Sequence, residues 1–183
     1  NREVRTSMIR SNSLKHGNGH AFFVTPCMFV QQNHPLTVIT TKQPINIMVQ
    51  AYNFLSSWQL FPEKGSYEKG NRPKSGYYKI ESKNSNNELT VTMNWVTLEN
   101  QSFSSEFTVI ADGAAHPFPH TEMAETVKVN FIDTISFENL FYNTDTLVLQ
   151  VLHEITPNGY LRITQRFFEQ GECRFTNVEY YHK

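Results

Sequence analysis

The sequence predicts an all-β protein, in the form of a single antiparallel up-and-down β-barrel of about eight to ten strands. Three observations lead to this fold class. From Trp58 onward apolar and polar residues alternate with a period of two, turn-forming residues separate the alternating runs, and almost every connection is short. The residues before Trp58 lack this pattern, so a short helix within an irregular N-terminal extension is expected to precede the barrel.

The alternating runs are typical of strands that bury one face. In residues 89–95 four apolar side chains alternate with Thr and Asn, and residues 103–109 and 127–131 repeat the pattern. Successive side chains of a strand point to opposite faces, so these runs predict half-buried strands. Further strands, rich in β-branched and aromatic residues, are predicted at residues 76–81, 134–141, 146–155, 160–168 and 173–181.

Asn, Gly, Asp and Pro mark the turns between these strands. They occur at residues 84–87, 99–101, 112–113, 142–145, 157–159 and 170–172. A meander of eight or more strands hides its edges best by closing on itself, which favours a barrel. A β-sandwich is the alternative, but Greek-key sandwiches need long crossovers, and only residues 111–125 are long enough to form one.

The chain is expected to divide into an N-terminal extension, residues 1–56, and a barrel, residues 57–183. Glycine- and proline-containing stretches break the extension into short pieces. Within it, residues 45–55 place apolar side chains near positions i, i+3, i+4 and i+7, which predicts an amphipathic helix.

Composition excludes several classes of partner. A net charge of −1 and a pI near 6.7 give no electrostatic preference for nucleic acid. The apolar runs are far shorter than the ~20 residues that cross a bilayer, so no membrane span is expected, and the compartment stays open. Cys27 and Cys173 lack a Cys or His at metal-ligand spacing. One disulfide is an alternative to the favoured interpretation, two unpaired and mostly buried thiols.

Short motifs in collinear order accompany the strand pattern. They are Trp58-Gln59-Leu60, the residues 62–67, 73–75 and 80–81, then Asp112-Gly113, His116-Pro117, Pro157-Asn158-Gly159 and the residues 161–165 and 175–180. Together they resemble the uncharacterised lipocalin-like domain of the calycin superfamily, which includes lipocalins and fatty-acid-binding proteins. The resemblance covers residues 58–183. It departs from the family pattern at Ser56, where such domains usually carry Gly.

The resemblance also implies a way of closing one end of the barrel. In such families an early Trp lies beneath an Arg or Lys from a late strand. Here that would place Trp58 against Arg162 or Arg166 in a cation-π contact.

Aromatic side chains are numerous enough to line the interior. A barrel of about eight strands has an interior that side chains can just fill, or that leaves room for one small ligand. A mostly apolar pocket with a few polar groups is how proteins hold small molecules. The candidate interior residues are Tyr78, Trp95, Phe103, Phe107, Phe131, Phe141, His153, Arg162 and Arg166, of which Tyr78 and the two arginines would meet a polar head group.

Histidines offer little support for a metal site. His116 and His120 have the i, i+4 spacing that joins two ligands on a helix, but the prolines between them forbid a helix, so an exposed loop at the barrel rim is expected. His153 lies in a predicted strand, and a hydrogen-bonded histidine of the barrel is favoured over a haem ligand. No metal and no cofactor is predicted.

Three functions compete at this point. The favoured one is non-catalytic binding of a small hydrophobic or amphipathic ligand inside the barrel. The second is a structural or protein-interaction module with a filled barrel, whose N-terminal extension would form a homo-oligomer. The third is a barrel enzyme, such as an isomerase, cyclase or decarboxylase, which needs two or more ionisable side chains inside the barrel. No catalytic residue is assigned.

Overall fold

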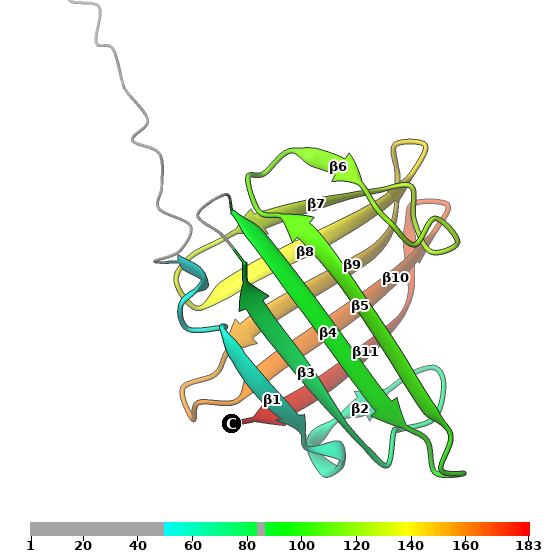
Figure 1. Ribbon diagram of the computed structural model, residues 1–183. Coiled ribbons are helices and arrows are strands. Elements are labelled where there is room, and N and C mark those ends of the chain that lie inside the picture. Colours follow the sequence, from blue (N-terminus) through cyan, green and yellow to red (C-terminus); the bar gives the residue numbers. More distant parts are fainter. Residues whose placement is uncertain (1–49, 84–86) are drawn as a thin grey trace, which may run out of the picture. The chain divides into compact units, whose positions relative to one another are not determined.

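A computed structural model describes residues 50–83 and 87–183, all of which belong to the unit formed by residues 42–183. Antiparallel β-structure dominates these residues (Figure 1). One short 3-10 helix, η1 (Pro62–Lys64), follows the first strand. The strands are β1 (Ser56–Leu60), β2 (Ser66–Tyr67), β3 (Ser75–Ser82), β4 (Glu88–Val96), β5 (Ser102–Ile110), β6 (Ala115–Pro117), β7 (Thr126–Phe131), β8 (Ser136–Asn143), β9 (Thr146–Ile155), β10 (Leu161–Glu169) and β11 (Glu172–His182).

The strands form one sheet in the order β5-β4-β3-β1-β11-β10-β9-β8-β7-β6, with β2 pairing on β11. Every pairing is antiparallel, and most neighbours are also consecutive in sequence. The first strand, β1, lies between β3 and the last strand, β11. The predicted antiparallel meander is therefore confirmed, and a single sheet replaces the two sheets of the sandwich alternative.

Hairpin turns explain how the strands reverse within so few residues. Thr144 and Asp145, between β8 and β9, have φ angles of 43° and 64°. Gln170 and Gly171, between β10 and β11, have φ angles of 53° and 81°. Positive φ at both central residues is the requirement of the type I′ turn, whose twist matches that of the strands it joins.

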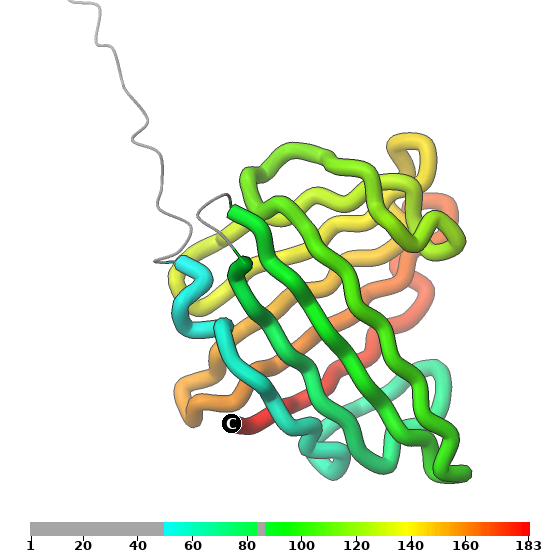
Figure 2. The backbone as a smooth tube through the Cα atoms, viewed as in Figure 1, coloured from blue at the N-terminus to red at the C-terminus, as the bar shows by residue number. Residues whose placement is uncertain are grey.

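The sheet curls until β5 lies against β7, although the hydrogen-bonded path ends at β5 and β6 (Figure 2). We call the region where β5 lies against β7 the seam. Side chains of the segment that follows β6 pack into it. Phe118 is 2% exposed, and its ring centroid lies 5.2 Å from that of Phe107 on β5 and 5.0 Å from that of Phe141 on β8. His120 Nε2 lies 3.2 Å from the carbonyl oxygen of Glu106 on β5. Side chains, more than strand pairing, hold this seam.

The inner face of the curved sheet carries the core. Alternate residues of each long strand are buried there, and their neighbours face outward. The largest fully buried side chains are Trp58, Tyr181, Phe54, Phe137, Phe141, Ile80, Leu89, Leu161, Ile163 and His153.

Only the end of the predicted helix lies within the described residues. Gln50 and Ala51 are helical, and a turn follows, in which the N–H groups of Phe54 and Leu55 donate to the carbonyl of Ala51. The predicted helix over residues 45–55 is therefore shorter at its end than expected, because the chain turns at residue 52 to bury Phe54. Residues 45–49 lie outside the described part of the chain.

Candidate ligand-binding site on the inner face of the sheet

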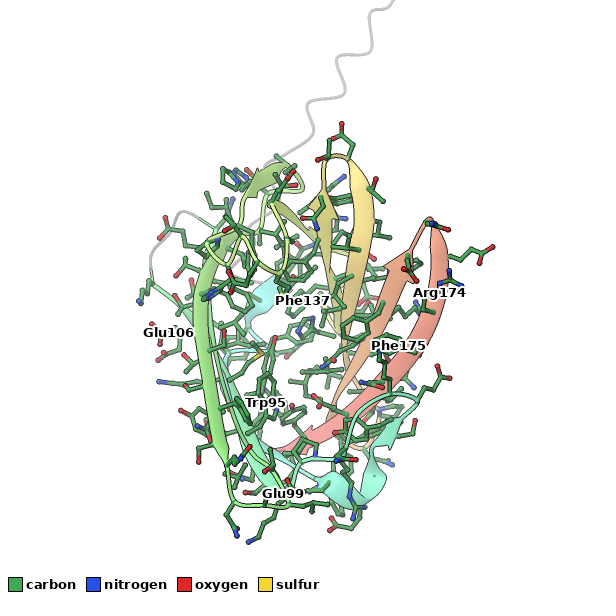
Figure 3. All side chains as sticks on the ribbon, turned by 90° about the vertical axis from the view of Figure 1, so that its right-hand side faces the viewer. Trp95, Glu99, Glu106, Phe137, Arg174 and Phe175 are labelled. Atoms are coloured by element: carbon green, nitrogen blue, oxygen red, sulfur yellow. The ribbon has the colours of Figure 1, made fainter. Side chains whose placement is uncertain are left out.

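Aromatic side chains from opposite walls meet inside the curved sheet. Figure 3 shows Trp95 of β4 and Phe137 of β8 pointing into the space between their strands, whereas Glu106 and Arg174 point away from it. Phe137 packs edge to face on Phe54, with ring centroids 4.7 Å apart. This inner face is apolar along most of its length, so polar groups on it stand out.

Glu179 is the most unusual of these polar groups. It lies on β11 opposite Ile163 of β10 and is 4% exposed. Its Oε2 accepts hydrogen bonds from the Tyr181 hydroxyl at 2.7 Å and from Gln165 Nε2 at 3.3 Å. Its Oε1 accepts a hydrogen bond from the Tyr67 hydroxyl at 3.1 Å. We call Glu179, Tyr181, Gln165 and Tyr67 the inner acid cluster.

Among the residues that the structure describes, no positively charged side chain forms an ion pair with the carboxylate of Glu179. The ion pairs among residues 50–83 and 87–183 involve other carboxylates. Burial raises the pKa of the Glu179 carboxyl above its usual value, and the hydrogen bonds from Tyr181 and Tyr67 oppose that rise. The same burial, together with the Glu179 charge, raises the pKa values of Tyr67 and Tyr181, so both phenols stay protonated and act as donors.

A second polar pair lies deeper in the interior. The Tyr78 hydroxyl and His153 Nε2 are 2.9 Å apart, and the imidazole stacks on Phe137 with centroids 4.1 Å apart and planes 3° from parallel. Complete burial lowers the pKa of His153 to about 3, although the nearby backbone of Phe137 and Val151 favours its charged form. His153 is therefore neutral at physiological pH. The predicted satisfied histidine of the barrel is therefore satisfied at one nitrogen only, because the buried Nδ1 of His153 has no hydrogen-bond partner among the described residues.

Tyr78 connects this pair with the inner acid cluster. Its ring centroid lies 5.7 Å from that of Tyr181. Burial, and next the Glu179 carboxylate, raise the pKa of Tyr78. The His153–Tyr78 pair and the inner acid cluster are thus neighbours on one wall, joined by the ring contact of Tyr78 with Tyr181.

Trp95 approaches the inner acid cluster from β4. Its indole lies close enough to the Tyr181 hydroxyl to favour the ionised phenol, yet its buried Nε1 has no partner at hydrogen-bond distance within the described part of the chain. Gly76, opposite Trp95 on β3, makes room for the indole, because a Cβ atom there would lie 3.1 Å from Trp95 Cδ1 and 2.4 Å from the carbonyl oxygen of Asn94. The geometry leaves a donor aimed at the cluster.

A groove of about 790 Å³ opens near the ends of β10 and β11. Among its lining residues, Phe167 and Phe175 stack with centroids 4.3 Å apart. Strand alternation places Phe167 on the same face as Gln165, and Phe175 on the same face as Glu179. At about 3.3 Å per residue, Phe175 lies roughly 13 Å along β11 from Glu179. The groove therefore lies at the end of the wall that carries the inner acid cluster.

Six of the nine predicted interior residues are brought together on the inner face. Tyr78 and His153 form the hydrogen-bonded pair, and Trp95 lies over the cluster. The phenylalanines among the six, Phe107, Phe131 and Phe141, belong to the core or pack against it.

Three of the predicted interior residues are not buried on the inner face: Phe103, Arg162 and Arg166. Phe103 lies opposite Trp95 of β4, on the face of Phe107, but is 54% exposed because it stands near the end of β5, an edge strand of the hydrogen-bonded path. Arg162 lies on the face opposite Leu161 and Ile163, where its Nη2 is 2.7 Å from Glu154 Oε2. Arg166 shares that outer face, and its Nη1 donates to Gln150 Oε1 at 3.0 Å.

Trp58 is buried as expected, at 1% exposure, but its cation-π partner differs from the prediction. Lys183 Nζ lies 4.7 Å from the indole centroid, in place of Arg162 or Arg166. The indole Nε1 donates to the carbonyl oxygen of Phe54 at 2.9 Å. The cation comes from the chain end because β11, not β10, is the strand that pairs with β1.

Histidine and cysteine side chains elsewhere have local partners. His116 Nε2 lies 2.9 Å from Asp112 Oδ1, and His120 Nδ1 lies 3.6 Å from Glu122 Oε1. Within the described ranges no three His, Cys, Asp or Glu side chains are grouped to hold a metal ion. Cys173 carries a free thiol and is exposed, so the expectation that it is buried is wrong. Cys27 lies outside the described residues.

Glu179, Tyr67, Gln165 and Tyr181 were not predicted as site residues. The period of two could have identified three of them. In residues 173–181 it puts Glu179 on the face of Tyr181, and in β10 it puts Gln165 on the face of Ile163. Tyr67 lies in β2, which is too short to show any alternation.

Comparisons with known proteins do not identify a family for this chain. No protein-family model matches the chain, and no curated protein matches it either. In the part of the chain that the structure describes, no helix combines the length and apolar character needed to cross a membrane.

Proposed function

We propose that this protein binds a small amphipathic molecule inside a lipocalin-like β-barrel formed by the curved sheet. The observation that carries the proposal is the inner acid cluster, a compact polar site on an aromatic and aliphatic inner wall. An apolar site with a few convergent polar groups and perturbed pKa values is the usual form of a small-molecule site. The apolar part of the ligand would contact the aromatic wall, and its polar end would meet the cluster.

The barrel itself is supported by the way the two ends of the sheet meet. β5 lies against β7, and Phe118 joins the side chains of β5 and β8 across the seam. Closure of this kind, together with the collinear motifs of residues 58–183, supports membership of the calycin superfamily. A closed barrel also accounts for an inner face that is apolar on strands from both ends of the sheet.

An enzyme is the weaker alternative. Glu179 and His153 satisfy the requirement for two ionisable side chains on the inner face. However, His153 is fully buried, bonded to Tyr78 and covered by Phe137, so it is not free to meet a substrate. The proposed N-terminal contribution to a homo-oligomer concerns residues outside the described part of the chain.

Titration with a neutral fluorescent amphiphile, N-phenyl-1-naphthylamine, tests the proposal. We expect saturable fluorescence enhancement at one probe per chain, competed by dodecan-1-ol, and a matching complex in native mass spectrometry. Val151→Trp should abolish binding, because Val151 lies on the inner face of β9 and a larger side chain would occupy the ligand space.

Leu152→Trp is the matched control. Leu152 is the next residue of the same strand and faces outward opposite Thr164, so the same substitution should leave probe binding intact. If the folded wild-type protein binds no probe and no alcohol, the interior is solidly packed and the proposed function is wrong.

A further inference from the structure

We propose that the polar end of the ligand is a protonated amine, held at Glu179 within the rings of Tyr78, Tyr181 and Trp95. This inference rests on the proposed function and specifies the chemical class of its ligand. It follows from three features of the site: an uncompensated carboxylate, an incomplete set of hydrogen bonds to it, and a surround of aromatic rings.

The carboxylate is the first feature. A buried carboxylate without a cation is costly, because it has lost its hydration and gains only hydrogen bonds in return. Glu179 is 4% exposed, and the groups that contact it from β2, β10 and β11 are the neutral side chains of Tyr67, Gln165 and Tyr181. A bound cation would supply the missing charge, whereas an anionic ligand would add a second negative charge beside it.

The hydrogen bonds to Glu179 are the second feature. A carboxylate offers about four acceptor positions, and three donors occupy three of them. An ammonium group carries only donors, so it can use the remaining position. A neutral alcohol can do the same, but it brings no charge to the site.

The aromatic surround is the third feature. Tyr181 is bonded to Glu179, the Tyr78 ring lies 5.7 Å from the Tyr181 ring, and the Trp95 indole approaches the Tyr181 hydroxyl from the opposite wall. Ring faces attract cations within about 6 Å of the centroid, and Trp and Tyr do so most strongly. A carboxylate among such rings is complementary to an alkylammonium head group.

Three ligands with the same twelve-carbon chain test the inference: dodecylamine, dodecan-1-ol and dodecanoate, each displacing N-phenyl-1-naphthylamine from the wild-type protein at pH 7.5. We expect dodecylamine to bind about tenfold or more tighter than the alcohol, and dodecanoate to bind most weakly. In Glu179→Gln the preference for the amine over the alcohol should disappear, because the amide carries no negative charge.

Glu138→Gln is the control for the removal of a carboxylate. Glu138 faces outward from β8 and also accepts hydrogen bonds from two amide side chains, those of Asn130 and Gln150. This variant should keep the wild-type preference for the amine.

A pH titration of the wild-type protein tests the inference without any substitution. Affinity for dodecylamine should fall more steeply than affinity for the alcohol as the pH is lowered and Glu179 becomes protonated, because only the amine loses an attraction between charges. The other groups facing the site do not change charge between about pH 3 and pH 7.5. The phenols of Tyr67, Tyr78 and Tyr181 stay neutral. His153 stays neutral above about pH 3, and Arg72 near Tyr67 stays charged.

The outcomes separate this inference from the proposed function. Equal affinity for amine and alcohol, or tighter binding of dodecanoate, would overturn the amine inference alone. Failure of all three ligands to displace the probe would overturn the proposed function and the amine inference with it.

Discussion

Two buried ionisable side chains face the same interior, and they make stability depend on pH in opposite directions. Burial lowers the pKa of His153 and raises the pKa of Glu179. Below about pH 6.5 the unfolded chain takes up a proton at His153 that the folded protein does not, so acid destabilises the fold through this residue. Glu179 acts the other way, because the folded state keeps a proton that the unfolded state releases above about pH 4.5.

Replacing His153 should isolate its share of this pH dependence. In His153→Gln the amide can still bond the Tyr78 hydroxyl but does not titrate. The wild-type protein should lose about 2 kcal/mol more of its free energy of unfolding between pH 7 and pH 5 than the variant does, from ~1.4 kcal/mol per pH unit below the unfolded pKa. Urea unfolding at the two pH values measures the difference, and Glu179 contributes equally to both proteins. Identical pH profiles would show that the pKa of His153 is the same in the folded and unfolded states.

Strand alternation predicts most residues of the inner face, and the exceptions have physical reasons. Tyr78, Trp95 and His153 lie where the period of two puts them. Alternation also puts Glu179 on this inner face, but acidic side chains are seldom buried, so composition argued against placing it inside. Arg162 was placed inside by the family resemblance, although Leu161 and Ile163 on either side of it already occupied that face.

At the scale of the element, Gly76 determines where Trp95 can lie. Because Gly76 has no side chain, the backbone of β3 approaches Asn94 of β4 and the indole of Trp95 lies close to it. Gly in a strand often marks this kind of close approach. The Trp95 Nε1 then points toward the inner acid cluster, so the pairing of two strands sets the geometry of the site.

Gly76→Ala should therefore disturb both stability and the site. We expect a loss of about 1–3 kcal/mol in the free energy of unfolding, the usual cost of overpacking, together with a shift in tryptophan fluorescence. Urea unfolding and emission spectra measure these effects.

Gly159→Ala is the matched glycine control. Gly159 has a φ of 77° and no neighbour within 4 Å of the added Cβ, so the change should cost about 1 kcal/mol in backbone strain. It should leave the tryptophan spectrum unchanged. If Gly76→Ala also leaves the spectrum unchanged, Gly76 does not position Trp95.

Long strands could be predicted from the sequence to within about two residues, and short ones could not. The prediction for β9, residues 146–155, agrees with the structure at both ends. β2 and β6 contain two and three residues, which is too few for a period of two to be recognised. The register shifts lie at Phe141/Tyr142 and Phe167/Phe168, near strand ends, so alternation remains correct over the central part of each strand.

At the scale of the whole described unit, the seam between β5 and β7 was the part that sequence reasoning could not supply. Residues 111–125 lack alternation, and their contribution depends on contacts with strands that are distant in sequence. Phe118 contacts Phe107 and Phe141 at once, and His120 contacts the β5 backbone. An unpaired strand edge is a site for unwanted association, and this segment covers part of the β5 edge.

The seam predicts unequal effects for two phenylalanines. Phe118→Ala should lower the free energy of unfolding by about 3–5 kcal/mol, because it removes a fully buried ring that joins both sides of the seam. Phe103→Ala, at the exposed end of β5, should cost less than about 1 kcal/mol.

Hydrogen exchange tests the role of Phe118 in the seam. Measured without denaturant, at a pH where the variant remains folded, Phe118→Ala should show faster exchange in β5 and β6 than the wild-type protein. Exchange that rises equally in every strand would mean that the unit opens only as a whole, and Phe118 would then be a core residue without a special role in closure. Faster exchange confined to the seam would instead identify the region between β5 and β7 as the part of the sheet that opens most readily.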